Sequence, residues 1–368
     1  MRIGIMLRAY DRPGGIGIYC RNIVKHLLAH DQANHYVLMY SNKKHVGTYN
    51  HLENVEEVYL ASTNLFIWDQ WQVPQVVKKY NIDLLFNTKF SLPFLTRVTK
   101  MMVLHGASWF VRPDLYKKLD ILYVRMMMPM YCRLADYLVS NSDLTTRDFI
   151  KILKVPADKI ETVRLSYDDS FAPVQDEEKL QEIRRKYALP GRFIVTVTSY
   201  DPRKNFETLV RAFEKCRLRE DVHLVVVGKD CRNYISDYSI DDELAGYIHF
   251  PGWVEQKDLP AIYSMAEVFA FPSVYEEFGI PVVEAMACGC PVVSSDTGAI
   301  PELTDGAALL ADPFSVDDQT ENLLAVLEAP AVRDQYCEKG LERAKDFSWD
   351  KAARQTLEIF SRFNKSSN

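Results

Sequence analysis

Hydrophobic and polar positions along the chain form two recurring kinds of segment. Short apolar runs rich in β-branched residues alternate with longer amphipathic stretches, and loops containing Gly, Pro, Asn or Asp separate them. This alternation predicts βαβ units, and therefore parallel sheets with helices on both faces. The run HLVVVG is apolar almost throughout, which is typical of a strand buried on both faces. The predicted strands are residues 2–7, 36–40, 83–87, 100–105 and 137–142 in the first half of the chain, and 193–198, 223–228, 268–273 and 290–295 in the second.

The pattern divides into two α/β domains. A chain of 368 residues with 48% hydrophobic residues can bury two cores, because single cores rarely grow beyond about 250–300 residues. The apolar periodicity lapses at residues 166–179, SYDDSFAPVQDEEK, which marks the expected linker. We therefore expect Rossmann-like domains at 1–168 and 169–345, followed by an amphipathic helix within 346–368. Ligands of such folds bind beyond the carboxyl ends of the strands, where the domains meet.

Composition excludes several other classes of protein. The formal net charge is −6 with both signs spread along the chain, which argues against a nucleic-acid-binding face. No run approaches the roughly 18 apolar residues of a membrane span, and the N-terminus is interpreted as a strand rather than a signal peptide. The seven cysteines lack the spacing of zinc or redox sites, and Cys288-Gly-Cys290 is interpreted as packing at a tight turn. We therefore expect a reduced, cytoplasmic protein.

Two features of the first half follow predicted strands. Gly14, Gly15 and Gly17 precede a helix, so the backbone there could approach a ligand at a helix N-terminus. This is not the GxGxxG pattern of dinucleotide-binding folds, and glycines that only form a turn are the alternative. His105 ends the run KMMVLH, where it would face the ligand crevice as a hydrogen-bond donor, an acid or a base. The alternative is a histidine that caps the strand-to-loop turn.

In the second half, two cations follow the predicted strand FIVTVT. Arg203 and Lys204 stand in the turn PRKN, and Asn205 is expected to cap the next helix. Two cations beside a positive helix N-terminus suit a diphosphate. The alternative is two solvated basic residues in a loop.

Two glutamates lie eight positions apart around an FGIP turn. Pro281 fits the first position of a helix and Gly279 allows a sharp entry into it. Glu276 would then approach a ligand from the loop and Glu284 from the helix, while the backbone amides of residues 278–280 suit a phosphate. Carboxylates for hydroxyl groups beside amides for phosphate predict a sugar-nucleotide site.

The stretch FPSVYEEFGIPVVEAMACGCPVVSSDTGAIPEL closely resembles the signature of the retaining glycosyltransferases of family four, whose glutamates have E-x7-E spacing. The segments PGGIGIY, VLHG, YLVSNSDLTTRDFIK, PRKN and FPGWVEQKDLPAIYSMAEVFAFPS extend the resemblance over most of the chain. It implies the GT-B fold: two facing Rossmann-like, doubly wound parallel-sheet domains, with the active site in the cleft between them. It also implies that the C-terminal helix, within 346–368, crosses back to the first domain.

The resemblance assigns roles to individual residues. Arg203 and Lys204 would hold the donor diphosphate, Glu284 the nucleotide ribose, and Glu276 the transferred sugar. His105 and Gly15 would face the donor sugar from the first domain. The remaining implied contacts are backbone amides at Phe278, Gly279 and Ile280, and the turn at Gly252, Trp253 and Val254 beside the base.

The chain departs from the family pattern at several positions. Glu277 stands where glycine is usual after the first glutamate, and Ser199-Tyr200 where many members have an arginine. His105-Gly106 replaces the usual HD, and LSYDDSF replaces an asparagine-glycine pair before the linker.

The implied reaction transfers a hexose from a nucleoside-diphosphate sugar to an acceptor hydroxyl with retention of configuration. GDP-mannose is the preferred donor, no metal is expected, and the implied setting is bacterial cell-surface polysaccharide assembly. Same-face displacement is favoured because no nucleophile for a covalent intermediate stands out. The alternatives are a sugar-nucleotide-binding scaffold without turnover, or a sugar-phosphate synthase or phosphorylase of the same fold; a dehydrogenase is disfavoured.

The acceptor, a glycan or a lipid-linked sugar, is expected to bind the first domain. Residues 113–137 mix Lys and Arg with Met, Leu and Tyr. They would form either an amphipathic helix packed on the sheet, with Met filling gaps, or a peripheral contact with the inner face of the membrane.

Overall fold

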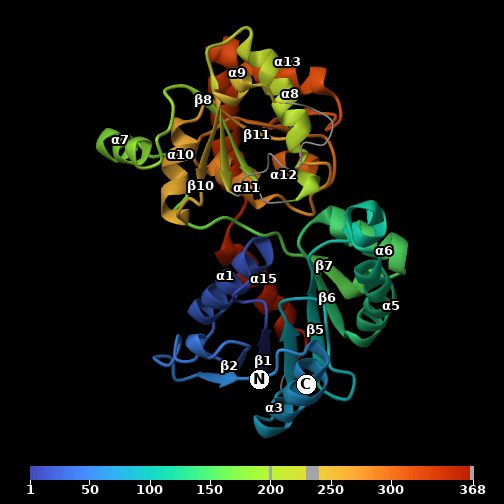
Figure 1. Ribbon diagram of the computed structural model, residues 1–368. Coiled ribbons are helices and arrows are strands. Elements are labelled where there is room, and N and C mark those ends of the chain that lie inside the picture. Colours follow the sequence, from blue (N-terminus) through green and yellow to red (C-terminus); the bar gives the residue numbers. More distant parts are fainter. Residues whose placement is uncertain (199–200, 229–239, 365–368) are drawn as a thin grey trace. The chain divides into compact units, whose positions relative to one another are not determined.

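The computed structural model describes residues 1–198, 201–228 and 240–364, and the chain forms two compact units (Figure 1). Unit 1 comprises residues 1–165 together with the C-terminal segment from Ser348, and unit 2 comprises residues 166–347. The departure from the family pattern at 199–200 lies outside the described residues.

Unit 1 is built on a seven-stranded, fully parallel sheet in the order β3-β2-β1-β4-β5-β6-β7. Five of the strands were predicted from their apolar runs. β3 was not, because its sequence VEEVY is polar and partly exposed, and β7 was not, because it has only three residues. The strands are β1 Arg2–Leu7, β2 His35–Tyr40, β3 Val55–Tyr59, β4 Leu84–Asn87, β5 Thr99–Leu104, β6 Tyr137–Ser140 and β7 Ile160–Thr162.

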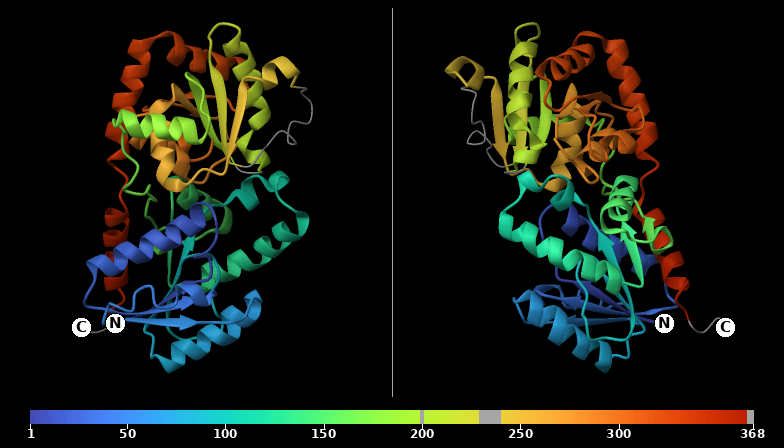
Figure 2. Two further views of the ribbon diagram at one scale, coloured as in Figure 1. Left: turned by 60° about the vertical axis from the view of Figure 1, so that its left-hand side comes forward. Right: turned by 90° about the vertical axis from the view of Figure 1, so that its right-hand side faces the viewer.

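Helices cover both faces of this sheet, as expected for βαβ units (Figure 2). The α-helices are α1 Gly15–His30, α2 Leu65–Ile67, α3 Val73–Lys79, α4 Ser108–Val111, α5 Lys118–Leu134, α6 Asp143–Leu153 and α15 Trp349–Ser361. A π-helical turn, η2 Trp68–Gln72, joins α2 to α3. Short 3-10 turns lie at η1 Lys43–His45, η3 Pro113–Leu115 and η4 Ala157–Lys159.

The C-terminal helix α15 belongs to unit 1, where it packs on α1 (Figures 1 and 2). The ring of Trp349 lies 6.1 Å from that of Tyr19, and Phe360 contacts Phe86 edge to face at 5.3 Å. Asp350 Oδ1 lies 2.7 Å from a ring nitrogen of His26 and 2.7 Å from one of His30. Apolar contacts and shared hydrogen bonds therefore fasten the end of the chain to the first helix.

Unit 2 contains a six-stranded parallel sheet in the order β10-β9-β8-β11-β12-β13. Its strands are β8 Phe193–Thr198, β9 His223–Gly228, β10 Ile248–Gly252, β11 Val268–Phe271, β12 Val292–Ser295 and β13 Leu309–Ala311. Its α-helices are α7 Glu177–Lys186, α8 Phe206–Arg217, α9 Asp242–Ala245, α10 Leu259–Met265, α11 Ile280–Ala287, α12 Ile300–Thr304, α13 Val316–Glu328 and α14 Pro330–Ala344, with 3-10 turns η5 Pro202–Lys204 and η7 Gln256–Asp258.

Each sheet has one position where the strand order reverses. In unit 1 the chain proceeds outward from β1 to β3 and then returns to place β4 on the other side of β1. In unit 2 it proceeds outward from β8 to β10 and returns to place β11 on the other side of β8. Because the connecting loops diverge at such a switch point, a crevice opens beyond the strand ends there. The two switch points, β1/β4 and β8/β11, are therefore where ligands are expected.

Candidate active site

The candidate site lies in unit 2, at the carboxyl ends of β8 and β11. The segment after β8 carries Arg203 and Lys204, and the loop after β11 carries Glu276. A backbone hydrogen bond of 2.8 Å from the amide of Val274 to the carbonyl of Arg203 joins the two segments. The switch point thus brings together Lys204 and Glu276, which are 72 positions apart in the sequence.

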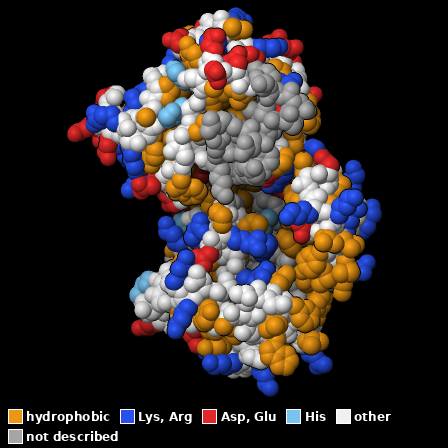
Figure 3. Space-filling model, viewed as in Figure 1, with side chains coloured by type: hydrophobic (Ala, Val, Ile, Leu, Met, Phe, Trp, Pro, Cys, Tyr) orange, Lys and Arg blue, Asp and Glu red, His pale blue; other side chains and the backbone are white. Residues whose placement is uncertain are grey.

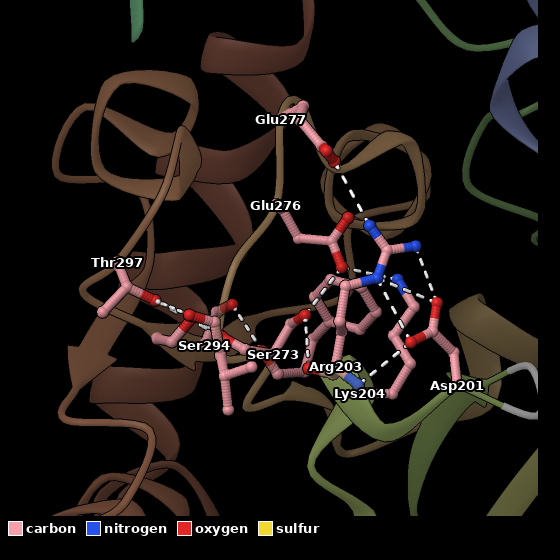
Figure 4. A network of polar contacts seen from close by, with 11 residues as sticks. Asp201, Arg203, Lys204, Ser273, Glu276, Glu277, Ser294 and Thr297 are labelled. Carbon is pink, nitrogen blue, oxygen red and sulfur yellow. Dashed lines mark hydrogen bonds and ion pairs between the residues drawn. The ribbon is translucent and has the colours of Figure 1, made fainter. Parts of the chain in front are cut away.

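Arg203 is held between two carboxylates. Its Nη2 lies 2.6 Å from Asp201 Oδ2, and its Nη1 lies 3.5 Å from Glu277 Oε2 (Figure 4). Burial favours the neutral carboxyl of Asp201, but hydrogen bonds and the charge of Arg203 hold the pKa of Asp201 below its usual value. The guanidinium is therefore oriented before any ligand arrives.

Lys204 forms the closest ion pair of this network. Its Nζ lies 2.5 Å from Glu276 Oε1, and it also lies 4.5 Å from the ring centre of Phe271. Ser273 Oγ donates to the same carboxylate oxygen at 2.6 Å. Only 16% of the Lys204 side chain and 11% of the Glu276 side chain are exposed, so water screens the pair weakly. A phosphate that binds Lys204 must therefore compete with Glu276 for the ammonium group.

The backbone of Glu276 is fixed by the segment after β12. The amide of Ala299 donates to the Glu276 carbonyl at 2.8 Å. Gly298 has a φ of +64°, and a Cβ there would lie 2.5 Å from that same carbonyl oxygen. Thr297 Oγ1 donates to the carbonyl of Val274 at 3.2 Å. Only glycine permits this close approach, so the segment sets the position of the Glu276 carboxylate.

Asn205 is the N-cap residue of α8, as predicted, but its side chain makes no capping hydrogen bond to the backbone of that helix. Asn205 adopts a left-handed conformation with φ 51°, and its Oδ1 accepts a hydrogen bond of 2.9 Å from the hydroxyl of Thr208 in α8 rather than from a helix backbone amide. The side-chain Nδ2 of Asn205 donates to the carbonyl of Pro313 at 2.5 Å. The side chain ties the PRKN turn to the loop after β13, a partner more than a hundred positions away that local sequence could not indicate.

The predicted helix after FGIP is present, but it begins one residue earlier than expected. Ile280 is the first residue of α11, so Pro281 occupies the second helical position. Gly279 is the N-cap residue, with φ 109°, and a Cβ there would lie 2.8 Å from Ile300 Cδ1. The backbone amides of Gly279 and Ile280 lack intrahelical partners, as at the start of any helix. Because glycine has no side chain, the N-cap residue cannot satisfy them. Phe278 is buried against the ring of Phe347 at 5.8 Å.

Glu284 has surroundings different from those of Glu276. It lies in the second turn of α11, is 7% exposed, and accepts a hydrogen bond of 3.4 Å from the hydroxyl of Tyr263 on α10. Burial raises the pKa of Glu284 to about 7, Tyr263 opposes this, and the nearby negative charge of Asp168 adds to it. The carboxylate is therefore destabilised without a ligand, as expected of a group that awaits hydroxyl donors.

The two predicted residues of unit 1 lie at the carboxyl-end side of its sheet. His105 follows β5, and its Nε2–H donates to the carbonyl of Thr88 at 2.7 Å. Burial lowers the pKa of His105 to about 4, Thr88 opposes this, and the positive charge of Lys89 adds to it, so the ring is neutral at pH 7. This geometry fits the turn-capping alternative and leaves Nδ1 as an acceptor. Gly15 is exposed and begins α1.

The turn after β10 places its two predicted residues in opposite environments. Trp253 is 82% exposed, whereas Val254 is 5% exposed. A large exposed indole is available to stack on a planar ligand, and Val254 anchors the turn in unit 2.

Comparison with known proteins identifies the family. Residues 13–171 match the model of Glycosyltransferase Family 4, and residues 180–343 match that of Glycosyl transferases group 1. The O-antigen chain mannosyltransferase B of Escherichia coli is 30% identical over 261 residues, which cover 70% of this chain and 68% of that protein. The chain belongs to glycosyltransferase family four. Further curated relatives of this family-four glycosyltransferase are matched over 29% to 59% of their own length.

Solved structures of low sequence identity have the same fold as this family-four glycosyltransferase. The sucrose-phosphate synthase of Thermosynechococcus elongatus superposes with a TM-score of 0.80 at 20% identity, covering all of both chains. Anabaena HepE in complex with UDP-glucose superposes with a TM-score of 0.75 at 19% identity, over 98% of this chain and all of HepE. With its two parallel-sheet α/β units, the family-four chain has the GT-B fold.

Sequence reasoning missed several residues that shape the site. Asp201, Ser273 and Gly298 contact Arg203 or Glu276, yet none was assigned a role. The glycine of the SSDTG segment was the signal for Gly298, because a glycine in a loop after a strand often marks a close backbone contact.

A group of side chains in unit 1 was also missed. Within the described part of the chain, His26, His30 and Asp350 form a group that could hold a metal ion. Asp350 is too distant along the chain for the sequence to indicate this group.

Proposed function

We propose that this family-four glycosyltransferase transfers a hexose from a nucleoside-diphosphate sugar to an acceptor hydroxyl with retention of configuration. One observation carries the proposal: Lys204, which follows Arg203, pairs with Glu276 at the β8/β11 switch point, in the unit that also contains the uncapped N-terminus of α11. Cations and backbone amides suit the diphosphate, and carboxylates suit the hydroxyl groups of ribose and sugar.

The chemistry follows from charge. As the glycosidic bond breaks, negative charge grows on the departing diphosphate, and Arg203, Lys204 and the α11 amides are oriented to stabilise it. Binding would draw Lys204 from Glu276 to the phosphate and release the Glu276 carboxylate towards the sugar. We propose turnover without a metal ion, because these groups supply the positive field. Same-face displacement, with the phosphate accepting the acceptor proton, needs no protein nucleophile.

The donor, acceptor and biological setting are proposals at a finer level. GDP-mannose is the preferred donor and a cell-surface glycan or glycolipid the acceptor, supported by the similarity to an O-antigen chain mannosyltransferase. A sugar-phosphate synthase remains the competing enzymatic function. A scaffold without turnover is disfavoured by the intact Arg203, Lys204, Glu276 and Glu284 set.

We further propose a cytoplasmic location with peripheral contact to the inner face of the membrane through α5. Among the described residues, no helix is long and apolar enough to cross a membrane. The helix packs Val124, Met128 and Tyr131 into the core of unit 1, as the packing alternative predicted. Its outer side exposes an apolar stripe among basic side chains (Figure 3), which suits an anionic lipid surface. The stripe consists of Leu119, Leu122, Met126 and Met130, and the basic side chains are Lys117, Lys118, Arg125 and Arg133.

The deciding experiment measures thermal stabilisation of the chelator-treated protein by GDP, UDP, ADP and their sugar conjugates. A ligand at 100 times its Kd raises stability by about 2.7 kcal/mol. We expect one nucleotide series to stabilise the wild type and to have little effect on Glu284→Ala. With that donor, nuclear magnetic resonance of the product should show the donor's anomeric configuration. The absence of a response to every nucleotide would contradict the proposal.

A further inference from the structure

Two histidines of α1 and one aspartate of α15 converge on one point of unit 1. His26 and His30 are four positions apart in α1, so their side chains lie on the same face of that helix. Asp350 is in the first turn of α15, and its Oδ1 lies 2.7 Å from Nδ1 of His26 and 2.7 Å from Nε2 of His30. The three ligand atoms that this group offers all lie within 4.8 Å of one another. The proposed transfer reaction uses none of these residues.

The three side chains offer the donor atoms that a divalent transition-metal ion prefers. Imidazole nitrogen suits Zn²⁺, Cu²⁺, Ni²⁺ and Fe²⁺, whereas Mg²⁺ and Ca²⁺ favour sites made of oxygen alone. Two imidazoles one helical turn apart, joined by a carboxylate from another segment, are a ligand set that zinc proteins use. Among the residues that the structure describes, no fourth His, Cys, Asp or Glu joins the group. A water molecule would therefore complete a tetrahedral shell around Zn²⁺.

The positions of the three ligand atoms are close to those around a bound zinc ion. Zinc–ligand bonds of about 2.0–2.1 Å in a tetrahedron separate the ligand atoms by about 3.3 Å, so the two nitrogen–oxygen distances of 2.7 Å must each widen by about 0.6 Å. The Asp350 side chain is 56% exposed, whereas that of His26 is 10% and that of His30 21% exposed. The histidines therefore form a fixed pair, and the aspartate can move as the third ligand without disturbing the core.

Without a metal ion, one oxygen of Asp350 serves both histidines. An ionised carboxylate only accepts hydrogen bonds, so the two ring nitrogens that face it carry hydrogen. A metal ion would take the place of these two hydrogens, because an imidazole nitrogen binds metal only when unprotonated, and each ring would keep its hydrogen on the other nitrogen. Binding thus exchanges two hydrogen bonds to a half-exposed carboxylate, which contribute little, for three metal–ligand bonds.

We propose that His26, His30 and Asp350 bind one Zn²⁺ ion, and that this ion fastens α15 to α1. Its ligands come from segments more than three hundred positions apart, so they meet only in the folded unit 1. An ion that binds only the folded form stabilises that form by mass action. The inference goes beyond the proposed transferase function, because it uses no residue of unit 2 and gives the ion no part in turnover.

The test measures Zn²⁺ binding to the full-length, chelator-treated protein by competition with a chromogenic indicator. We expect one ion per chain, bound at least about tenfold more tightly than Mn²⁺ or Mg²⁺, as nitrogen ligands require. Co²⁺ in place of Zn²⁺ should give the visible absorption of a four-coordinate ion. Added Zn²⁺ should also raise the midpoint of thermal unfolding and slow hydrogen exchange in α15 and in the C-terminal half of α1.

Three variants locate the ion. His30→Gln and Asp350→Asn should each weaken Zn²⁺ binding at least about tenfold and abolish the slowing of exchange in α15. His26→Gln should do the same, but His26 is buried, so the other two variants carry the test if this one does not fold. His51→Gln removes an exposed histidine of unit 1 outside the group and is the matched control, which should bind Zn²⁺ like the wild type.

Three results would overturn the proposal. Zn²⁺ that binds no more tightly than Mg²⁺ would show that the three residues form a hydrogen-bonded cluster only. Equal Zn²⁺ binding by the wild type, His30→Gln and Asp350→Asn would place the ion on other surface groups. Zn²⁺ that binds at the group without slowing exchange in α15 would overturn the fastening role. Each result is independent of nucleotide binding, which tests the site in unit 2 separately.

Discussion

The two glutamates of the FGIP segment are eight residues apart but differ in their electrostatic surroundings. Glu276 is paired with Lys204, whereas Glu284 is buried beside a neutral phenol, that of Tyr263. The first carboxylate is already stabilised, and the second depends on a ligand for stabilisation. Substitutions at these positions should therefore have opposite effects on the free protein.

Glu284→Gln should stabilise the ligand-free protein at pH 8 by about 1–3 kcal/mol while weakening nucleotide binding. A carboxyl group whose folded pKa is raised from 4.5 to about 7 contributes stability at low pH that is lost as the pH rises through about 7. Glutamine has the same shape, accepts from Tyr263 and carries no charge. Urea unfolding between pH 4 and 8.5 measures the difference, which should vanish at about pH 4, below the unfolded pKa of 4.5. A variant less stable than the wild type at pH 8 would contradict this reading.

Glu277→Ala should raise the affinity for a nucleoside diphosphate about two- to fivefold, because a carboxylate 3.5 Å from Arg203 competes with the phosphate. The gain should shrink at high salt, since screening weakens both interactions. Calorimetric titration of GDP and UDP at two salt concentrations provides the measurement. Asp317→Ala removes an exposed carboxylate elsewhere in unit 2 and should leave the affinity unchanged. A decrease in Glu277→Ala would instead mean that Glu277 orients Arg203 productively.

At the scale of elements, the candidate site in unit 2 and a cavity in unit 1 both lie where the strand order of a sheet reverses. β8 and β11 place the cations beside Glu276, and β1 and β4 place Arg8 and Lys89 in the wall of that cavity. The contact between α1 and α15 is the other element-level feature, because it joins segments more than three hundred positions apart. Its polar part is Asp350 with His26 and His30.

Asp350→Asn should destabilise unit 1 by up to about 1 kcal/mol at pH 6, since Asp350 is about half exposed and exposed pairs contribute little. Hydrogen bonds from His26 and His30 lower the pKa of Asp350 in the folded protein. Such a carboxylate contributes stability above its unfolded pKa of about 3.9, and this stability is lost as the pH falls through the folded value. Thermal unfolding from pH 3 to 7 tests this, with exposed Asp120→Asn of α5 as control. Identical profiles for the two variants would show that the cluster adds nothing to helix docking.

At the scale of the whole molecule, unit 1 is discontinuous in sequence: the C-terminal helix completes the unit with which the chain begins. The α15 residues Trp349, Ala353, Ile359 and Phe360 are buried there. Loss of a single large core side chain costs about 3–5 kcal/mol, and whole domains are stable by only about 5–15 kcal/mol.

A chain that ends at Phe347 should therefore lose the cooperative folding of unit 1 while unit 2 stays folded and still binds nucleotide. Hydrogen exchange read by mass spectrometry should show fast exchange in β1, β4 and α1, and native protection in β8 and β11. Thermal stabilisation by the nucleotide that binds the full chain should persist. Native protection of β1 and α1 in the truncated chain would show that α15 is dispensable for unit 1.

Much of the fold could be predicted from the sequence because buried parallel strands and amphipathic helices leave local patterns. β1 and β8 match their apolar runs at both ends. β3 was not predicted because it is an edge strand with polar positions. β7 and β13 were not predicted because three residues carry too little pattern. Arg203, Lys204, Glu276 and Glu284 could also be selected as candidate ligand-binding residues, because such residues cluster after strands and glycine and proline mark the turns.

The sequence by itself thus determined the class of fold, the family, and which segments end in candidate ligand-binding residues, since these depend on local periodicity and on motifs within a short span. Only the tertiary structure decided the partners of those residues. It paired Lys204 with Glu276, left Glu284 with Tyr263, turned the side chain of Asn205 to Pro313, and enclosed Asp69 among the cations that line the cavity of unit 1. Such pairings depend on which strands become neighbours, and burial then sets the charge state and the unmet hydrogen bonds.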